Sequence, residues 1–176
     1  MIFYTSDLHF CDEKILKVCK RPYDSVDTMN HALTNNWNSR IGEMDTTYIL
    51  GDIFPCAGFE AKTIFDLIKN LHGKKVLIAG NHDEDYLQEL EQSGLFENIT
   101  RIAFVTDSGK EIVLCHYPLM SWRNDEAGSV HLYGHLHNKN LPEVQKYYKD
   151  KNAYNVGLDV RNFTPLTLSE ILGGKK

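Results

Sequence analysis

The stretch LIAGNHDED, residues 77–85, changes character halfway along its length. Its first three residues, Leu-Ile-Ala, favour a buried strand, whereas the polar residues Asn81, His82 and Asp83 follow almost at once. Such a segment is either a simple turn or a place where polar groups are needed at the end of a strand. The rest of the chain helps to decide between these readings, because the same arrangement recurs.

The composition limits the class of protein. A chain of 176 residues is long enough for one domain with a substantial core, and we expect residues 1–176 to form a single domain. The net charge of −5 argues against an extended basic surface for nucleic acid. The first ten residues show neither a basic leader nor a long apolar run, so we expect no membrane association and a cytoplasmic location.

Seven short runs rich in β-branched or aromatic residues predict strands. They are MIFYTS (1–6), TTYIL (46–50), KKVLIAG (74–80), TRIAFVT (100–106), EIVLCHY (111–117), VHLYG (130–134) and AYNVGL (153–158). Apolar residues at spacings of three and four predict amphipathic helices over 25–41, 59–72 and 84–92, the second running from Phe59 to the residue before Gly73. The pattern indicates an α/β fold whose second half is richer in strands and hairpins.

Residue types that bind metals follow five of the predicted strands. Asp7 and His9 follow the first strand, Asp52 the second, Asn81 the third, His116 the fifth, and His135 and His137 the sixth. Carboxylate, imidazole and amide donors suit manganese, iron, zinc or nickel, and we favour manganese. Residues two apart lie on the same side of an extended chain, so each Asp-x-His or His-x-His pair could reach one ion. The set is large enough for two divalent ions that share one carboxylate.

Glycines precede several of these candidate ligands. Gly51, Gly80 and Gly134 each stand where a strand ends and the chain must turn sharply. A glycine also lets the backbone come close to a bound group. We therefore expect close packing of the backbone around the site.

Taken in order, these motifs resemble those of the calcineurin-like metallophosphoesterase superfamily. They are SDLH (6–9), GD (51–52), GNHD (80–83), CHYP (115–118) and GHLH (134–137). The resemblance implies a four-layer α/β/β/α sandwich with a dinuclear metal site at the strand ends. It also implies that Asp7, His9 and His137 hold the first ion, that Asn81, His116 and His135 hold the second, and that Asp52 bridges both. The motifs CHYP and NVGLDV (155–160) are similar to those of a small group of predicted bacterial and phage phosphoesterases.

A site of this kind suits hydrolysis of a phosphomonoester or a phosphodiester by in-line attack of a metal-bridging hydroxide. We predict catalytic roles for Asp52, as the bridging ligand, and for His82, which is left over after the ligands are assigned. His82 would stabilise the transition state and protonate the leaving group. Asp83 has two readings: it caps the following helix, which we favour, or it supports the charge of His82.

Contacts with the substrate are harder to predict. Arg21, in the connector CKRPY, is either a clamp for a phosphate or a member of a surface salt bridge. Asn155 is a second candidate for substrate binding, and Arg123 and Arg161 are weaker ones. We expect a small phosphorylated substrate, with nucleotides among the candidates.

Two other functions are compatible with these motifs. One is a non-catalytic metal-binding scaffold of the same fold, but scaffolds of this kind usually lose ligands that this chain retains. The other is a metal hydrolase that acts on an amide or another non-phosphate bond. Assays with simple phosphate and amide substrates distinguish between these functions.

Overall fold

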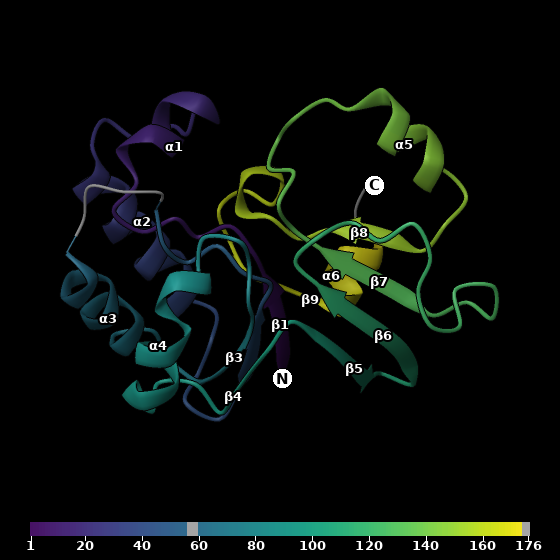
Figure 1. Cartoon of the computed structure of the whole chain (residues 1–176), viewed down its shortest axis with the longest axis horizontal. Helices are drawn as coiled ribbons and strands as arrows, with labels where there is room; N and C mark the ends of the chain where they lie inside the picture. The colour runs from purple at the N-terminus through teal and green to yellow at the C-terminus, as the bar shows by residue number, and fades with distance from the viewer. Residues whose placement is uncertain (56–59, 174–176) are drawn as a thin grey trace.

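Two β-sheets form the centre of the computed structural model, which describes residues 1–55 and 60–173 (Figure 1). The first sheet has the strand order β4 (Asn98–Thr100), β3 (Lys74–Ile78), β2 (Thr46–Ile49), β1 (Ile2–Thr5) and β9 (Leu166–Thr167). All of its neighbours are parallel except β1 and β9. The second sheet has the order β5 (Ile102–Asp107), β6 (Lys110–Cys115), β7 (Val130–Tyr133) and β8 (Ala153–Asn155). Only the β5–β6 hairpin is antiparallel in this second sheet.

Helices cover the outer faces of both sheets. On the first sheet lie α1 (Glu13–Val18), α2 (Val26–Asn38), α3 (Ala61–Lys69) and α4 (Leu87–Ser93), with the 3₁₀ turn η1 (Glu84–Tyr86) before α4. On the second sheet lies α5 (Pro142–Tyr148), while η2 (Leu158–Val160) and α6 (Leu168–Gly173) flank β9. Among the described residues, no helix is both long and apolar enough to cross a lipid bilayer.

Alternation along the strands separates the core into three apolar layers. In β1, Phe3 packs with the helices of the first sheet, whereas its neighbour Tyr4 packs between the two sheets. In β6, Leu114 packs between the sheets, whereas Val113 packs with Tyr148 of α5. Successive side chains of a strand point to opposite faces, so each sheet is apolar on both sides. The layers follow the order helices, first sheet, second sheet and helix α5, with one apolar layer between each pair of neighbours. This is the predicted four-layer α/β/β/α sandwich, which is therefore confirmed.

The predicted elements are present with shifted ends. Each of the seven predicted strands forms, and α2 begins after Ser25, whose Oγ accepts a hydrogen bond from the Thr28 N–H at 3.1 Å. That helix ends at Asn38, earlier than predicted, although Ile41 is still buried. Phe59, the predicted start of the second helix, lies outside the described residues, and the helix itself spans α3. The third predicted helix is divided into η1 and α4.

The two sheets are joined at the carboxyl end of β1. Ser6, just beyond this strand, forms an isolated parallel bridge with Gly157, just beyond β8. The Leu158 N–H donates to the Ser6 carbonyl oxygen at 3.1 Å. This bridge brings the loops that follow the strands of both sheets to one end of the molecule.

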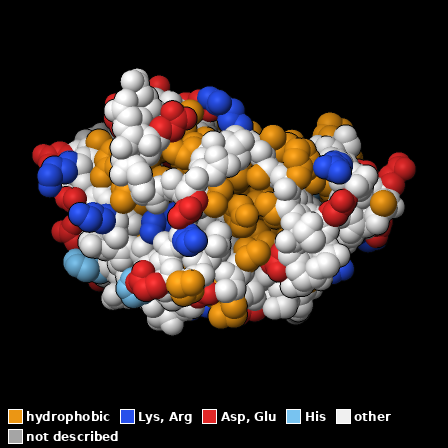
Figure 2. Space-filling model, turned by 90° about the horizontal axis from the view of Figure 1, so that it is seen from below, with side chains coloured by type: hydrophobic (Ala, Val, Ile, Leu, Met, Phe, Trp, Pro, Cys, Tyr) orange, Lys and Arg blue, Asp and Glu red, His pale blue; other side chains and the backbone are white. Residues whose placement is uncertain are grey.

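At the opposite end, the core between the sheets reaches the surface. Figure 2 shows hydrophobic side chains gathered in the middle of the face seen from below, with charged groups around them. Members of this core such as Ile2, Tyr48 and Val105 are only partly buried. The polar loops and the apolar surface are therefore at different ends of the sandwich.

Candidate metal centre

The predicted ligands lie together at the carboxyl ends of the strands. Asp7 and His9 follow β1, Asp52 follows β2, Asn81 follows β3, His116 follows β6, and His135 and His137 follow β7. Parallel neighbours end at the same edge of a sheet, and the Ser6–Gly157 bridge adds the loops of the second sheet. Positions far apart in the sequence therefore meet in one cluster.

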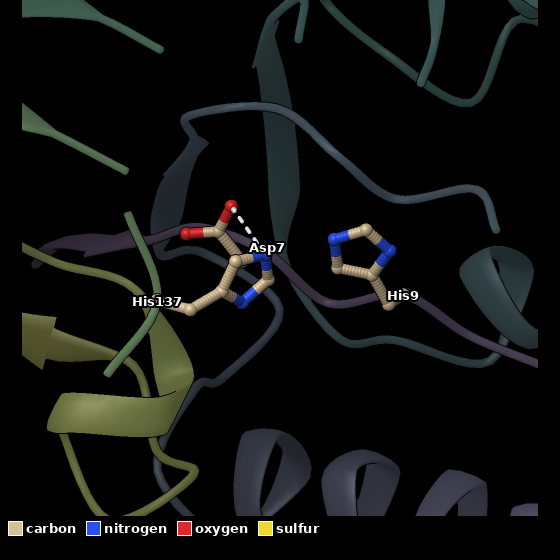
Figure 3. Close-up of side chains that lie close together, drawn as sticks. All are labelled: Asp7, His9 and His137. Carbon is tan, nitrogen blue, oxygen red and sulfur yellow. Dashed lines mark ion pairs between the residues drawn. The ribbon is translucent and has the colours of Figure 1, made fainter. Parts of the chain in front are cut away.

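The first group contains Asp7, His9 and His137, all of which are buried (Figure 3). Each offers one ligand atom, and these atoms lie within 4.8 Å of one another. His137 Nε2 is 4.0 Å from Asp7 Oδ1, and the His9 and His137 rings are 5.0 Å apart between centroids. Three donors at this spacing can hold one cation.

The second group contains Asp52, His116 and His135, whose ligand atoms also lie within 4.8 Å of one another. His116 Nε2 is 3.3 Å from Asp52 Oδ2. It is also 3.2 Å from Asn81 Oδ1, so the amide oxygen belongs to the same group. These four residues include the three that the resemblance assigns to a second ion.

Asp52 lies between the two groups. Its Oδ2 is 3.7 Å from His9 Nε2 on one side and 3.3 Å from His116 Nε2 on the other. His82 Nε2 is 3.9 Å from the same oxygen. One carboxylate oxygen is therefore close to both groups and to the predicted proton donor.

The backbone of the ligands is not extended, contrary to the sequence prediction. Five ligand positions have positive φ: Asp7 (60°), His9 (48°), Asp52 (57°), His135 (67°) and His137 (51°). Residues other than glycine rarely adopt this left-handed backbone conformation, and each residue that does so stores about 1–3 kcal/mol of strain. Asp7 and His9 still reach the same group, whereas His135 and His137 lie in different groups, so the expectation that each pair reaches one ion holds for the first pair alone. Strain of this kind is typical of binding and catalytic sites.

Gly80 shows why glycine is needed beside the ligands. A Cβ at this position would lie 2.3 Å from Asp52 Oδ1 and 2.7 Å from the Asp52 backbone nitrogen. At Gly134, a Cβ would lie 1.9 Å from Ser6 Oγ. The expected close approach of backbone to the site is therefore present.

A second set of residues orients the imidazole rings. His116 Nδ1 is 2.7 Å from the Leu50 carbonyl oxygen, and His137 Nδ1 is 2.8 Å from Asp159 Oδ2. A proton on each Nδ1 leaves Nε2 of both rings directed toward the cluster. Sequence reasoning missed Asp159, whose one signal was its place in the motif NVGLDV.

Arg21 holds Asp159 and does not face a substrate. Its guanidinium is buried and donates to Asp159 from Nε at 2.8 Å and from Nη2 at 3.0 Å. It also donates to the carbonyl oxygens of Leu8, at 2.9 Å, and Asp7, at 2.7 Å. Both readings of Arg21 are therefore wrong: it is neither an available phosphate clamp nor a member of a surface salt bridge. Its donors hold the segment that carries the first ligands.

Asn155 is also occupied within the protein. Its Nδ2 donates to the His137 carbonyl oxygen at 3.1 Å, and its Oδ1 accepts from the Gly157 N–H at 2.8 Å. The prediction that Asn155 binds substrate is not supported, because both ends of its amide are hydrogen-bonded. It instead fixes the loop that contains His137.

His9 contains buried nitrogen atoms that lack hydrogen bonds. Neither Nδ1 nor Nε2 has a hydrogen-bond partner among the described residues, although Asp12 Oδ2 is 3.3 Å from Nδ1. Asp12 is positioned as the N-cap of α1, where Oδ1 accepts the N–H groups of Lys14 and Ile15. A buried polar atom without a partner costs about 1–3 kcal/mol, and a cation beside Nε2 would remove that cost. The donor set therefore fits a divalent metal.

Asp83 has a structural role that neither sequence reading gave. Its buried carboxylate accepts the N–H groups of Gly80, Asp52 and Ile53, each at 2.9 Å. It makes no side-chain cap to η1, so the favoured cap reading is wrong. Burial, together with the charge of Asp52, raises the pKa of Asp83 to about 6. The carboxylate joins the loop after β2 to the loop after β3.

Charges within the cluster shift the pKa values of its members. Burial opposes the ionised form of Asp52, but His116 lowers the pKa of this carboxyl to about 2. Burial also acts against the charged form of His137, but the hydrogen bond to Asp159 raises its pKa to about 10. The pKa of Asp159 is likewise lowered to about 2, against burial, by His137 and Arg21. The protein thus keeps carboxylates ionised in a buried site, which favours binding of cations.

His82 lies at the more exposed side of the cluster. Its side chain is 21% exposed, whereas those of Asp52 and His9 are 2% exposed. Its backbone N–H donates to Asp52 Oδ1 at 3.0 Å. Its ring packs edge to face against the His9 ring, with 5.0 Å between the ring centroids. Burial lowers the pKa of His82. The ring is therefore positioned beside the candidate metal centre and partly open to solvent.

The chain is similar in sequence to several known proteins. The family model described as calcineurin-like phosphoesterase matches residues 1–167. An uncharacterised protein of Methanocaldococcus jannaschii is 31% identical over 171 residues, covering 97% of this chain and 89% of that protein. The gene 66 protein of Mycobacterium phage L5 is 27% identical over 183 residues, covering 89% and 86% of the two chains.

A solved structure has a similar fold over the full length. It is a protein of unknown function from Aquifex aeolicus, with a TM-score of 0.76, 23% identity and 98% of each chain covered. The similarity to this structure supports the fold, and the family match over residues 1–167 includes every strand end that carries a candidate ligand. The chain belongs to the calcineurin-like phosphoesterase family.

Proposed function

We propose that the protein is a metal-dependent phosphoesterase that hydrolyses a small phosphomonoester or phosphodiester with two divalent ions. The observation that supports this most directly is the position of Asp52 Oδ2, which lies within 4 Å of nitrogens of His9, His116 and His82. Two groups of ligands therefore share one carboxylate. The family match supports phosphoester hydrolysis as the reaction class.

The two groups of side chains provide ligands for two ions. Asp7, His9, His137 and Asp52 would hold one ion, and Asn81, His116, His135 and Asp52 the other. Oxygen and imidazole donors suit manganese, which we propose, and also iron, zinc or nickel. When bound, such ions lower the pKa of a water molecule and offset the negative charge of a phosphate.

The remaining chemistry is proposed for His82. The hydrogen bond from the His82 backbone N–H to Asp52 Oδ1 fixes the position of His82 relative to the shared carboxylate. Its Nε2 lies on the more exposed side, where a phosphoester could enter, and would donate a proton to the leaving oxygen. Asp83 supports this geometry by holding the loop that carries His82 against the loop that carries Asp52. In this proposal His82 protonates the leaving group and is not a metal ligand, although its ligand atom lies within 4.8 Å of those of His9 and Asp52.

Metal analysis combined with substrate assays tests the proposal. We expect two divalent ions per chain after reconstitution with manganese, and hydrolysis of an aryl phosphate monoester or diester. His82→Ala should keep both ions, while the turnover number should fall by about two to four powers of ten. His31→Ala, on the exposed side of α2, is the matched control and should keep full activity.

Each alternative predicts a different result. Loss of an ion in His82→Ala would show that His82 is needed for metal binding and remove its assigned role. Two bound ions without hydrolysis of any phosphoester would favour the non-catalytic scaffold. Hydrolysis of amides alone would favour a metal hydrolase that acts on a non-phosphate bond.

A further inference from the structure

A cavity of about 640 Å³ lies between α5 and the outer face of the second sheet, beside the candidate metal centre. Its lining includes Leu136, His137, Val144, Tyr148, Asn155 and Arg161. In Figure 1, the chain that leads from β7 to α5 arches above β8 at this place. Sites for small molecules usually measure about 300–1,000 Å³, and the cavity falls within this range. It can therefore hold a whole small molecule, which is much larger than a single phosphate group.

The charge of the cavity is opposite to that of the whole chain. Among the residues that the structure describes, its lining contains Lys139, Lys149 and Arg161 and no aspartate or glutamate. The chain as a whole has a net charge of −5. Three cations around one concave surface without an acid favour an anionic ligand.

Arg161 is the most unusual of the three cations. It is partly buried, and its Nε donates to the Asn155 carbonyl oxygen at 2.7 Å. Within the described part of the chain, it forms no ion pair with a carboxylate. Arg21 provides a contrast, because its guanidinium is saturated by Asp159 and backbone oxygens. A partly desolvated guanidinium without an acidic partner is suited to bind a carboxylate or a phosphate.

The other side of the cavity is apolar. Leu136, Leu141 and Val144 are partly exposed within the lining, and Tyr148 packs behind them. Such a surface stabilises a ring or an aliphatic group by removing it from water. A matching ligand has an apolar body and a negative charge.

His137 connects the cavity to the metal centre. Its ring nitrogen Nε2 faces Asp7 in the cluster, yet the residue also lines the cavity. The His137 carbonyl oxygen accepts from Asn155 Nδ2, and the Asn155 carbonyl oxygen accepts from Arg161 Nε. Asn155 therefore links Arg161 to the loop of a proposed ligand, and Arg161 and His137 border the same cavity.

We propose that the cavity binds the leaving group of the substrate, and that Arg161 binds a second negative charge on that group. The substrate class is then a phosphoester whose leaving group carries both a ring or other apolar body and a further carboxylate or phosphate. Nucleotides that carry a second phosphate belong to this class. This inference rests on the proposed function and specifies its substrate.

A matched pair of substrates tests the role of Arg161. Phenyl phosphate lacks a second charge, whereas phenyl phosphates with a carboxylate on linkers of one and three methylenes supply it on the same ring. We expect kcat/KM of the wild type to favour at least one carboxylated substrate by about ten- to a hundred-fold, the range for a charge-assisted hydrogen bond. Arg161→Gln should abolish this preference, and Arg161→Lys should retain part of it.

Control variants separate recognition from a structural effect. Arg123→Gln removes an arginine outside this cavity, whose guanidinium lies over the Phe104 ring, and should leave the preference unchanged. If Arg161→Gln acted only by disturbing His137, kcat/KM would fall equally for all substrates. That result would overturn the proposal.

Binding measurements make the test independent of hydrolysis. Benzylphosphonate and its carboxylated analogues cannot be hydrolysed, and their affinities are measurable by calorimetric titration of the metal-loaded protein. We expect the same Arg161-dependent preference in these affinities. Arg161-dependent binding without turnover of any phosphoester would support the cavity site and reject the hydrolytic function. Equal affinities of charged and uncharged analogues for the wild type would reject the cavity site.

Discussion

Asp159→Asn is the substitution that most directly tests how the candidate metal centre is supported. The Asp159 side chain is 1% exposed and is shared between His137 Nδ1, at 2.8 Å, and the Arg21 guanidinium, at 2.8 and 3.0 Å. An asparagine has almost the same shape but no negative charge. The substitution therefore removes the charge with little change in packing.

Two effects of known size follow from these contacts. Loss of the carboxylate that orients a metal-binding histidine typically weakens metal affinity by about 10- to 100-fold. In addition, the buried guanidinium of Arg21 loses its counter-ion, which costs about 3–5 kcal/mol when one partner of a buried pair is removed. Since a typical domain is stable by only about 5–15 kcal/mol, the metal-free variant should be markedly less stable but still able to fold.

Calorimetric titration with manganese and urea unfolding measure these effects separately. We expect Asp159→Asn to weaken one of the two proposed manganese sites and to lower the free energy of unfolding of the metal-free protein. The double variant Arg21→Met, Asp159→Asn should recover part of the stability, because neither charge of this pair remains, but not the metal affinity. Asp24→Asn, at an exposed position, is the control for removal of an acid. Wild-type affinity for both ions in Asp159→Asn would refute the reasoning.

Three further predictions concern the candidate metal centre and a buried histidine of β7. Gly80→Ala places a Cβ 2.3 Å from Asp52 Oδ1, so the metal content and the free energy of unfolding should both fall, the latter by about 1–3 kcal/mol or more. Gly173→Ala is the control: its Cβ would meet no atom within 4 Å, so neither quantity should change. Burial lowers the pKa of His131 from 6.5 to about 4. Between pH 6.5 and pH 4 the His131 ring is protonated in the unfolded chain but not in the folded one, so the stability of the fold decreases as the pH falls through this range. The loss is about 3 kcal/mol by pH 4, and urea unfolding should show a shallower pH dependence for His131→Gln. Asn81→Ala and His116→Ala should each reduce occupancy of one ion and retain the other; two ions at full occupancy in both variants would contradict the division of ligands.

Local sequence patterns were sufficient to predict the strands of the fold and the residues that meet in the cluster at their ends. The strands that carry ligands are short apolar runs; three of them end in Gly-Asp, Gly-Asn-His or Gly-His, and the other two end in Ser-Asp and Cys-His, so both the strand and its polar end are visible in adjacent residues. Parallel strands then bring these ends to one edge. The conformation at the ends was not predictable in this way, because left-handed φ at Asp7 and His9 depends on the contacts made by the folded loops.

The missed features depend on distant contacts or on very short elements. The partners Arg21 and Asp159 are 138 positions apart, and no local pattern distinguishes a buried arginine with such a partner from an exposed one. The strands β4 and β9 have three and two residues, too few for an alternation to be recognised. α1 has six residues, although Asp12 before Glu13 is a recognisable N-cap signal.

The origin of the proposed ligands has a consequence for the lifetime of the protein. Asp7, Asp52 and Asn81 follow strands of the first sheet, whereas His116 and His137 follow strands of the second. Ions held by both sets would cross-link the two halves of the sandwich in addition to the Ser6–Gly157 bridge. A ligand present at a thousand times its dissociation constant adds about 4 kcal/mol to the stability of the state that binds it. Metal starvation in a cell would then expose the chain to proteases as well as stop its chemistry, so its abundance would follow the metal supply.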